Sequence, residues 1–260
     1  LNLDSSKSYS FTLANEYAFG GSIYYATTTD MGELNVDASG NVNYTIDADK
    51  LSFDVNVGAS NKVILNDGTL GKAVTGEGTL EISGDVTSKA DFIGAKVNTV
   101  DENKTLILTG NTLAGAVTGE GTLRISGDVT SKADYIGAKV NTVDENNTLI
   151  LTGGTAEKQI SGAGNVKVKG NVVMKAGPNV TGTVEVETGK TLEMALDNGA
   201  KDTVKIGNLN NQGTTKLSFD LDLENQGNSD FFDIGVTGAT TLTIGNINIL
   251  KDGDLSSYQL

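Results

Sequence analysis

The 260-residue chain contains no cysteine, no histidine and no tryptophan, and it has a single proline. Without cysteine, neither disulfide bonds nor thiol chemistry is possible. Without histidine, the chain lacks the commonest general base, the commonest metal ligand and the usual Ser or Cys triads. There is no apolar run of 18 residues, so we expect no membrane-spanning segment in this chain. We also expect no catalytic residue and no cofactor.

Basic residues are scarce as well. The formal net charge is −14, with 33 Asp and Glu against 19 Lys and Arg, and Arg124 is the only arginine. Nucleic-acid backbones are bound by clusters of Lys and Arg, so we expect no nucleic-acid partner. The acidity instead favours solubility of a long β surface. The chain begins at Leu1 without a charged, apolar leader, and we expect a fragment or a mature segment.

What the chain does contain is typical of an all-β protein. Glycine accounts for 33 residues, and Val, Ile, Leu and Thr occur in short runs separated by Gly, Asn and Asp. Such runs fit strands, and such separators fit turns. Tyr and Phe contribute seven residues each, so we expect a thin aliphatic core. No segment shows convincing helical periodicity, and we expect almost no helix.

One segment occurs twice. Residues 73–110 return as residues 116–153 at a period of 43 residues, with three changes in 38 positions, among them Glu81 to Arg124. A diverged third copy keeps the same register, so that repetition covers at least residues 57–194. A fixed period of this size indicates a solenoid, propeller or array.

The repeat predicts a right-handed parallel β-helix (β-solenoid). Its 43 residues divide into parts of about 22 and 21, each holding two or three short strands, so we interpret the repeat as two coils of 21–22 residues. Equivalent positions of successive copies should then stack above one another. We expect one continuous solenoid with aromatic-rich strands or a cap at 1–31, repetitive coils at 32–212 and distinct C-terminal coils at 213–260.

Substitutions between the copies predict which side chains face water. One position is Glu81 in the first copy, Arg124 in the second and Lys167 in the third, while its flanking residues, such as Leu80 and Ile82, stay aliphatic. A position that accepts an acid and then a base faces solvent, and its neighbours on the other side of the strand fill the core.

The same reasoning leaves Ile64, Ile107 and Ile150 pointing outward. They are candidates for a partner-binding stripe, or they are residues covered by loops or tolerated singly.

The aromatic residues near the N-terminus are a second candidate surface. Six of the 14 aromatics lie within residues 1–31, among them Tyr17, Phe19, Tyr24 and Tyr25. They either cap the first coil or form an exposed patch that binds a sugar or a protein.

Acidic residues near the C-terminus are the remaining candidates. Asp220 and Asp222 share one strand face by period two, and Asp230 and Asp233 flank two phenylalanines after a turn. Oxygen-rich turns of this kind are weak candidates for calcium ligands. They lack the spacing of an EF-hand loop or a nonapeptide calcium repeat, which favours solvated turn acids.

The C-terminal motif resembles a known family. The strings LSFDLDL, GNSDFFDIGVTG and ATTLTIGNINIL, within residues 217–250, resemble the C-terminal part of the passenger domain of classical (type Va) autotransporters of Gram-negative bacteria. The resemblance covers about 35 residues and implies a β-helix exported through an outer-membrane β-barrel translocator outside this chain. The resemblance thus implies that the chain is exposed at the bacterial cell surface or is secreted. The strict repeat departs from the irregular coils of most autotransporter passengers, so another secreted β-solenoid protein is the alternative.

We therefore expect a non-enzymatic passenger segment that acts as a rigid adhesin or structural stalk. Its partner would be a protein or glycan on a host or neighbouring cell. The alternative is a carbohydrate-active β-helix enzyme, a polysaccharide lyase or glycosidase, that uses the acids at 220–233. A third hypothesis, implied by the resemblance, is that residues 213–260 nucleate folding of a longer passenger.

Overall fold

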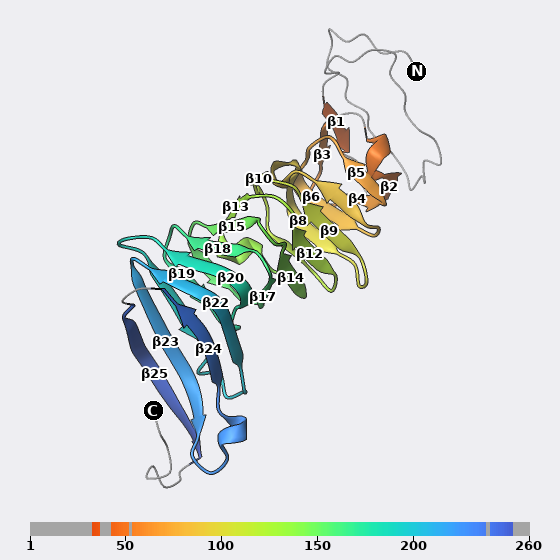
Figure 1. Ribbon diagram of the computed structural model, residues 1–260. Coiled ribbons are helices and arrows are strands. Elements are labelled where there is room, and N and C mark those ends of the chain that lie inside the picture. The colour runs from red at the N-terminus through yellow and green to blue at the C-terminus, as the bar shows by residue number, and fades with distance from the viewer. Residues whose placement is uncertain (1–32, 37–42, 52–53, 238–239, 252–260) are drawn as a thin grey trace, which may run out of the picture. The chain divides into compact units, whose positions relative to one another are not determined.

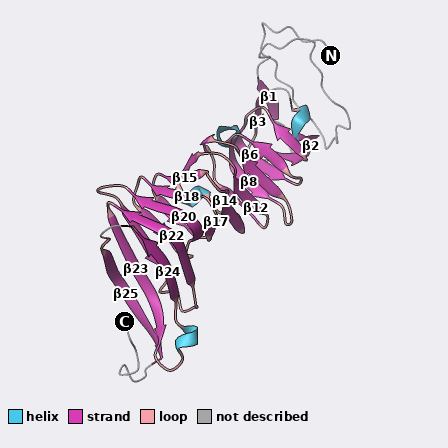
Figure 2. Ribbon diagram, in the orientation of Figure 1, coloured by secondary structure: helices cyan, strands magenta, loops and turns pink. Residues whose placement is uncertain are grey.

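The computed structural model describes residues 33–36, 43–51, 54–237 and 240–251. Over these residues the chain is an all-β parallel solenoid of about nine turns, which confirms the predicted fold class (Figure 1). The helices there are four 3-10 helices of three residues each (Figure 2). No helix in the described part of the chain is long and apolar enough to cross a membrane.

The chain divides into two compact units. The first comprises residues 1–129 and 135–140, and the second comprises residues 130–134 and 141–260. This division lies inside the second copy of the repeat. The expected N-terminal segment at 1–31, with Tyr17, Phe19, Tyr24 and Tyr25, falls outside the described residues.

The first unit contains β1 (Glu33–Val36), β2 (Asn43–Asp47), η1 (Ala48–Lys50), β3 (Asp54–Val57), β4 (Lys62–Asn66), β5 (Gly68–Leu70), β6 (Val74–Ile82), β7 (Val86–Ser88), η2 (Ala90–Phe92), β8 (Ile93–Val100), β9 (Thr105–Leu108), β10 (Asn111–Thr112), β11 (Val117–Gly119) and β12 (Thr122–Ile125). Three elements have residues in both units: β13 (Val129–Ser131), η3 (Ala133–Tyr135) and β14 (Val140–Val143).

The second unit contains β15 (Thr148–Leu151), β16 (Gly154–Ala156), β17 (Ile160–Gly162), β18 (Asn165–Val168), β19 (Val172–Met174), β20 (Asn179–Val186), β21 (Thr191–Ala195), β22 (Thr203–Asn211), β23 (Thr214–Asp222), η4 (Gln226–Asn228), β24 (Phe231–Val236) and β25 (Leu242–Lys251).

Strands of the first unit form parallel ladders in which each strand pairs with the strand one coil later. In the ladder β4–β6–β8–β11, Val63 pairs with Leu80, Leu80 with Asn98, and Asn98 with Val117. These steps are 17, 18 and 19 residues long. In the ladder β5–β7–β9–β12, Leu123 occupies the last strand.

The coil is shorter than the sequence predicts. One coil takes about 19 residues rather than 21–22, so the 43-residue repeat exceeds two coils by roughly five residues. As a result, equivalent residues do not stack. Leu80 of the first copy lies in the β4–β6–β8 ladder, whereas Leu123 of the second copy pairs with Leu106 in the β7–β9–β12 ladder. The predicted two-coil repeat is therefore wrong, because successive copies begin at different positions around the coil.

The predicted inward and outward faces are confirmed. Leu80 and Ile82 have no exposed surface, and Glu81 between them is partly exposed. The equivalent pairs of the second and third copies are also buried, while Arg124 is exposed. This alternation follows from the two-residue period of a strand and does not depend on which strands pair.

The second unit has the same construction. Its sheet β16–β19–β21–β23–β25 is parallel, with Met174 paired to Met194 and Met194 paired to Leu217. Met174 and Met194 are at most 1% exposed, because the core side chains of successive coils stack on one another. The core is aliphatic, as the composition predicts.

Glycine determines one corner of each copy. Gly76, Gly119 and Gly162 are equivalent, and their φ angles are 106°, 105° and 116°. A Cβ atom at Gly119 would clash with the backbone of Val100 in the preceding coil. Only glycine combines this left-handed conformation with so close an approach of two backbones.

Candidate functional site

Asp220 and Asp222, two of the candidate acids, lie on β23 and are 0% and 2% exposed. One carboxylate oxygen of Asp220 accepts a hydrogen bond from the Gly199 backbone N–H at 2.6 Å, and the other accepts one from the Asn248 side chain. The interpretation of these residues as solvated turn acids is therefore wrong, because their oxygens are buried and used as hydrogen-bond acceptors.

Asp222 organises the turn that follows β23. Its Oδ1 accepts the backbone N–H groups of Glu224 and Asn225, at 3.0 and 2.9 Å, and its Oδ2 accepts the side-chain amide of Asn228 at 2.9 Å. The hydrogen bond from Asn228, helped by that from Asn225, holds the pKa of Asp222 below its ordinary value. The ionised carboxylate thus stabilises the turn that contains η4.

Asp230 joins two segments of the second unit. Its Oδ1 accepts the backbone N–H of Asp202 at 2.6 Å, and its Oδ2 accepts that of Asp220 at 2.8 Å. Burial raises the pKa of Asp230 and outweighs the two N–H donors, while the charges of Asp202 and Asp220 raise it further. Asp233 lies apart from this group, exposed on β24 and paired in the ladder with Lys205.

Backbone N–H groups and asparagine side-chain amides therefore occupy the oxygens of three of the four candidate acids. Within the described residues, no group of three or more acidic side chains is arranged to hold a metal ion. These hydrogen bonds fasten turns to neighbouring strands through the carboxylate oxygens. The four acids do not come together as one site.

The candidate isoleucines are half-buried and do not form one stripe. Ile64 and Ile107 belong to different ladders of the first unit, because the copies of the repeat do not stack. Each isoleucine also lies beside a charged residue in its ladder: Ile64 beside Glu81, Ile107 beside Arg124 and Ile150 beside Lys167. Partner binding by these residues stays a prediction.

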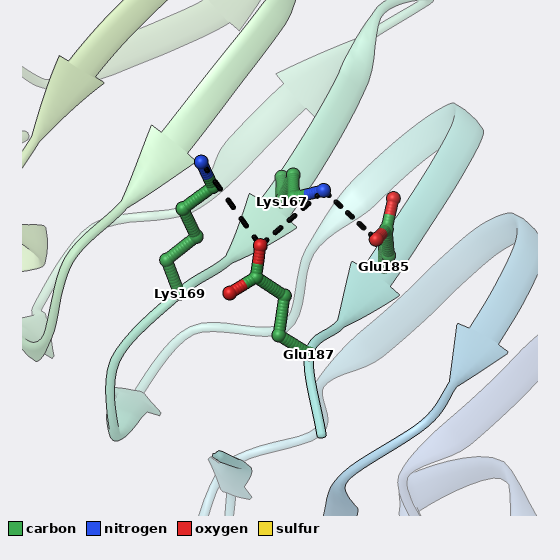
Figure 3. Close-up of polar contacts among 4 residues, drawn as sticks. All are labelled: Lys167, Lys169, Glu185 and Glu187. Atoms are coloured by element: carbon green, nitrogen blue, oxygen red, sulfur yellow. Dashed lines mark hydrogen bonds and ion pairs between the residues drawn. The ribbon is translucent and has the colours of Figure 1, made fainter. Parts of the chain in front are cut away.

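Ion pairs between neighbouring coils are a feature that the sequence analysis missed. Lys167 lies 2.9 Å from Glu185 and 3.3 Å from Glu187, and Glu187 also lies 4.0 Å from Lys169 (Figure 3). The hydrogen bond with Glu185 raises the pKa of Lys167.

The same pairing recurs along both units. Lysine and glutamate about one coil apart in sequence form ion pairs: Lys62 with Glu81, Lys96 with Glu77, Lys139 with Glu120, Lys175 with Glu157 and Lys216 with Glu193. The trace that these pairs leave in the sequence is the recurrence of opposite charges about 19 residues apart.

A second missed feature is the exposed apolar surface of the last described coil. Phe231, Val236, Ile244, Ile247 and Ile249 are 57%, 53%, 53%, 46% and 43% exposed. All five belong to β24 and β25. The alternation of the string LTIGNINIL predicted a strand, but only the pairing of strands showed that this strand is the outermost of its sheet among the described residues.

Comparisons with protein-family models, with curated proteins and with solved structures found no match to this chain. The similarity to autotransporter passengers therefore rests on the motif at 217–250 and on a compatible fold.

Proposed function

We propose that this chain is a non-enzymatic passenger segment, exposed at a bacterial surface or secreted, that acts as a rigid adhesin or structural stalk. The observation that carries the proposal is the way in which the coils are joined. Parallel ladders, core layers and ion pairs connect each coil to the next, so local contacts repeat along the chain. Repeated local contacts suit a load-bearing spacer, because each coil is supported on both sides.

The proposed activity is binding without turnover. The chain has no histidine, and its buried C-terminal acids are engaged by backbone donors. The partner would be a protein or glycan on a host or neighbouring cell, and export would use an outer-membrane barrel. The resemblance of residues 217–250 to autotransporter passengers supports this route.

Surface display tests the proposal. The whole chain is fused to a heterologous autotransporter barrel, and attachment of the displaying bacteria to epithelial cells and to sister bacteria is counted. Bacteria that display the chain should attach more strongly than bacteria with the barrel alone. The control is the chain with Gly119→Val, which we expect to fold poorly and to lose the gain. Equal attachment of all three strains would refute an adhesive role.

A glycan panel tests the enzymatic alternative. Purified chain is incubated with acidic polysaccharides, with and without calcium, and unsaturated and reducing sugars are measured. We expect no product. Product that disappears in Asp220→Asn but persists in Asp233→Asn would replace the adhesin proposal with a lyase or glycosidase.

A further inference from the structure

One exposed turn of the second unit contains the only Asn-Gly sequence of the chain. Asn198 and Gly199 lie between β21 and β22, and both residues are exposed. Gly199 has a φ angle of 84°, and a Cβ atom at this position would meet no other atom within 4 Å. Because glycine has no side chain, nothing on the second residue shields the peptide bond that joins the two.

Hydrogen bonds fix the polar atoms of this turn in one arrangement. The Gly199 backbone N–H donates to Oδ2 of the buried Asp220 at 2.6 Å. The Ala200 backbone N–H donates to the side-chain Oδ1 of Asn198 at 2.8 Å. The Nδ2 of Asn198 donates to Oδ2 of Asp202 at 2.7 Å. The side-chain amide of Asn198 and the N–H that follows it are therefore held together in a defined position.

These contacts favour attack of the Gly199 nitrogen on the side-chain amide carbon, Cγ, of Asn198. The two atoms are close along the chain, so a bond between them closes a succinimide ring. Negative charge develops on Oδ1 as that bond forms, and the Ala200 N–H already donates to this oxygen. N–H donors fixed in advance at a developing negative charge lower the activation barrier. The Asp220 carboxylate accepts the hydrogen that the Gly199 nitrogen must lose, which is the position of a general base.

We propose that Asn198 is a site of spontaneous covalent modification, at which the folded turn itself promotes succinimide formation. The bond between the Gly199 nitrogen and Cγ of Asn198 forms, and the bond between Cγ and Nδ2 breaks. The proton that the Gly199 nitrogen loses is accepted by Asp220 and passed to Nδ2, which leaves as ammonia. Water then adds to either carbonyl of the ring and opens it to aspartate or isoaspartate.

The products change the turn in two ways. A new carboxylate at position 198 lies beside Asp202, so a repulsion between like charges replaces the hydrogen bond. Isoaspartate also lengthens the main chain, which moves the Gly199 N–H away from Asp220. Because Asp220 is buried, losing this donor is costly. We therefore expect the modified chain to be less stable than the original one.

Peptide mass spectrometry tests the proposal on the whole purified chain, incubated at neutral pH either folded or unfolded in urea. We expect Asn198 to be converted about tenfold faster in the folded chain, which corresponds to about 1.4 kcal/mol in the activation barrier. Asn228 is the internal control, because it precedes a serine in the same unit, and the N–H of Asp230 donates to the Asp220 carbonyl instead of to Asn228. Its conversion should not be faster in the folded chain.

Conversion of Asn198 that is equally fast or slower in the folded chain would overturn the proposal, as would an equal acceleration of Asn228 on folding.

A substitution tests the part of Asp220. Asp220→Asn removes the carboxylate that accepts the Gly199 N–H, and it should bring the conversion of Asn198 in the folded chain close to the rate in urea. Asp233→Asn, in an exposed position on β24, is the matched control and should keep the fast conversion. Circular dichroism shows whether both variants keep their strand content. Fast conversion in a folded Asp220→Asn chain would reject the role of the turn. The comparison of folded and unfolded wild-type chain needs neither variant, and no result depends on whether the chain binds cells.

Discussion

The first and third copies of the repeat share one turn but differ in their cores. The first copy, in the first unit, places Ser88 and Asn98 in the core, and both are 1% exposed. The third copy, in the second unit, has Met174 and Val184 at the equivalent positions, and these are also buried. The backbone course of a coil therefore tolerates a polar or an apolar core.

The hydrogen-bond donors of both side chains in the first copy find partners, whereas the Asn98 Oδ1 is buried without one. The side-chain amide of Asn98 donates to the carbonyl oxygens of Ala95 and Ala116, at 2.8 and 2.9 Å. Ala116 belongs to the following coil, so this one side chain connects two coils. The Ser88 hydroxyl donates to the carbonyl of Lys89 at 2.9 Å. In the third copy, the apolar side chains of Met174 and Val184 fill the equivalent positions without hydrogen bonds.

One turn, in contrast, keeps its conformation in all three copies. Asn103 and Asn146 have φ angles of 61° and 64°, and Gly189 takes their place in the third copy with a φ of 73°. In each of these turns, the residue that follows donates its backbone N–H to the carbonyl three residues earlier. The comparison teaches that backbone conformation at corners is the stricter requirement of this fold.

The largest effect should come from a corner glycine. Gly119→Val places a β-branched side chain at a φ of 105° and against the backbone of Val100, and it should lower the free energy of unfolding of the first unit by about 4 kcal/mol. Gly189→Asn is the matched control and should cost less than about 0.5 kcal/mol, because asparagine already occupies this turn elsewhere. Urea denaturation measures both, and similar losses would contradict the importance of corners.

Exchanging the core residues of the two copies should have the next largest effect. Val184→Asn buries an amide in an apolar layer and should cost about 2–3 kcal/mol. The reverse change, Asn98→Val, removes one donor from two carbonyls and should cost about 1 kcal/mol. Thermal unfolding of the two variants measures the difference. If Asn98→Val proved the more damaging, the amide of Asn98 would be a stricter requirement than we infer.

Acidity should affect the turn at Asp222. Its pKa in the folded chain is lowered, so its ionised form contributes stability that is present above the unfolded pKa and is lost as pH falls through the folded pKa. Asp222→Asn should therefore destabilise the chain more at pH 7 than at pH 3. Denaturation at the two pH values measures this, and Asp233→Asn, in an exposed position on β24, is the control substitution. An equal loss for Asp222→Asn at both pH values would exclude this role of its charge.

The smallest effect should come from an ion pair on the coil surface. Glu81→Arg gives the first copy the residue of the second, but it places a positive charge beside Lys62. We expect a loss of up to about 1 kcal/mol at low salt, which 1 M NaCl largely removes by screening. The double change of Lys62→Glu with Glu81→Arg should restore stability. A loss that is insensitive to salt would show that the packing of the side chains matters more than their charge.

Much of the fold could be predicted from local sequence patterns. The burial of Leu80 and Ile82, and the exposure of position 124, follow from alternation within a single strand. The strand face that Asp220 and Asp222 share could be predicted, but their burial could not. Burial of Asp220 depends on Gly199 and Asn248, which are 21 and 28 residues away in sequence and join it only after the coils have stacked.

The sequence by itself determined which side chains face the core, where the chain turns and that its copies share one backbone design. It determined these features because they depend on neighbours within a strand or a turn. Only the tertiary structure decided the coil length of about 19 residues, the pairing partner of each strand and the exposed apolar surface at β24 and β25. A repeat of 43 residues states how far apart equivalent residues are along the chain. The repeat length does not give the number of coils in that distance. The pairing of the strands decides that number.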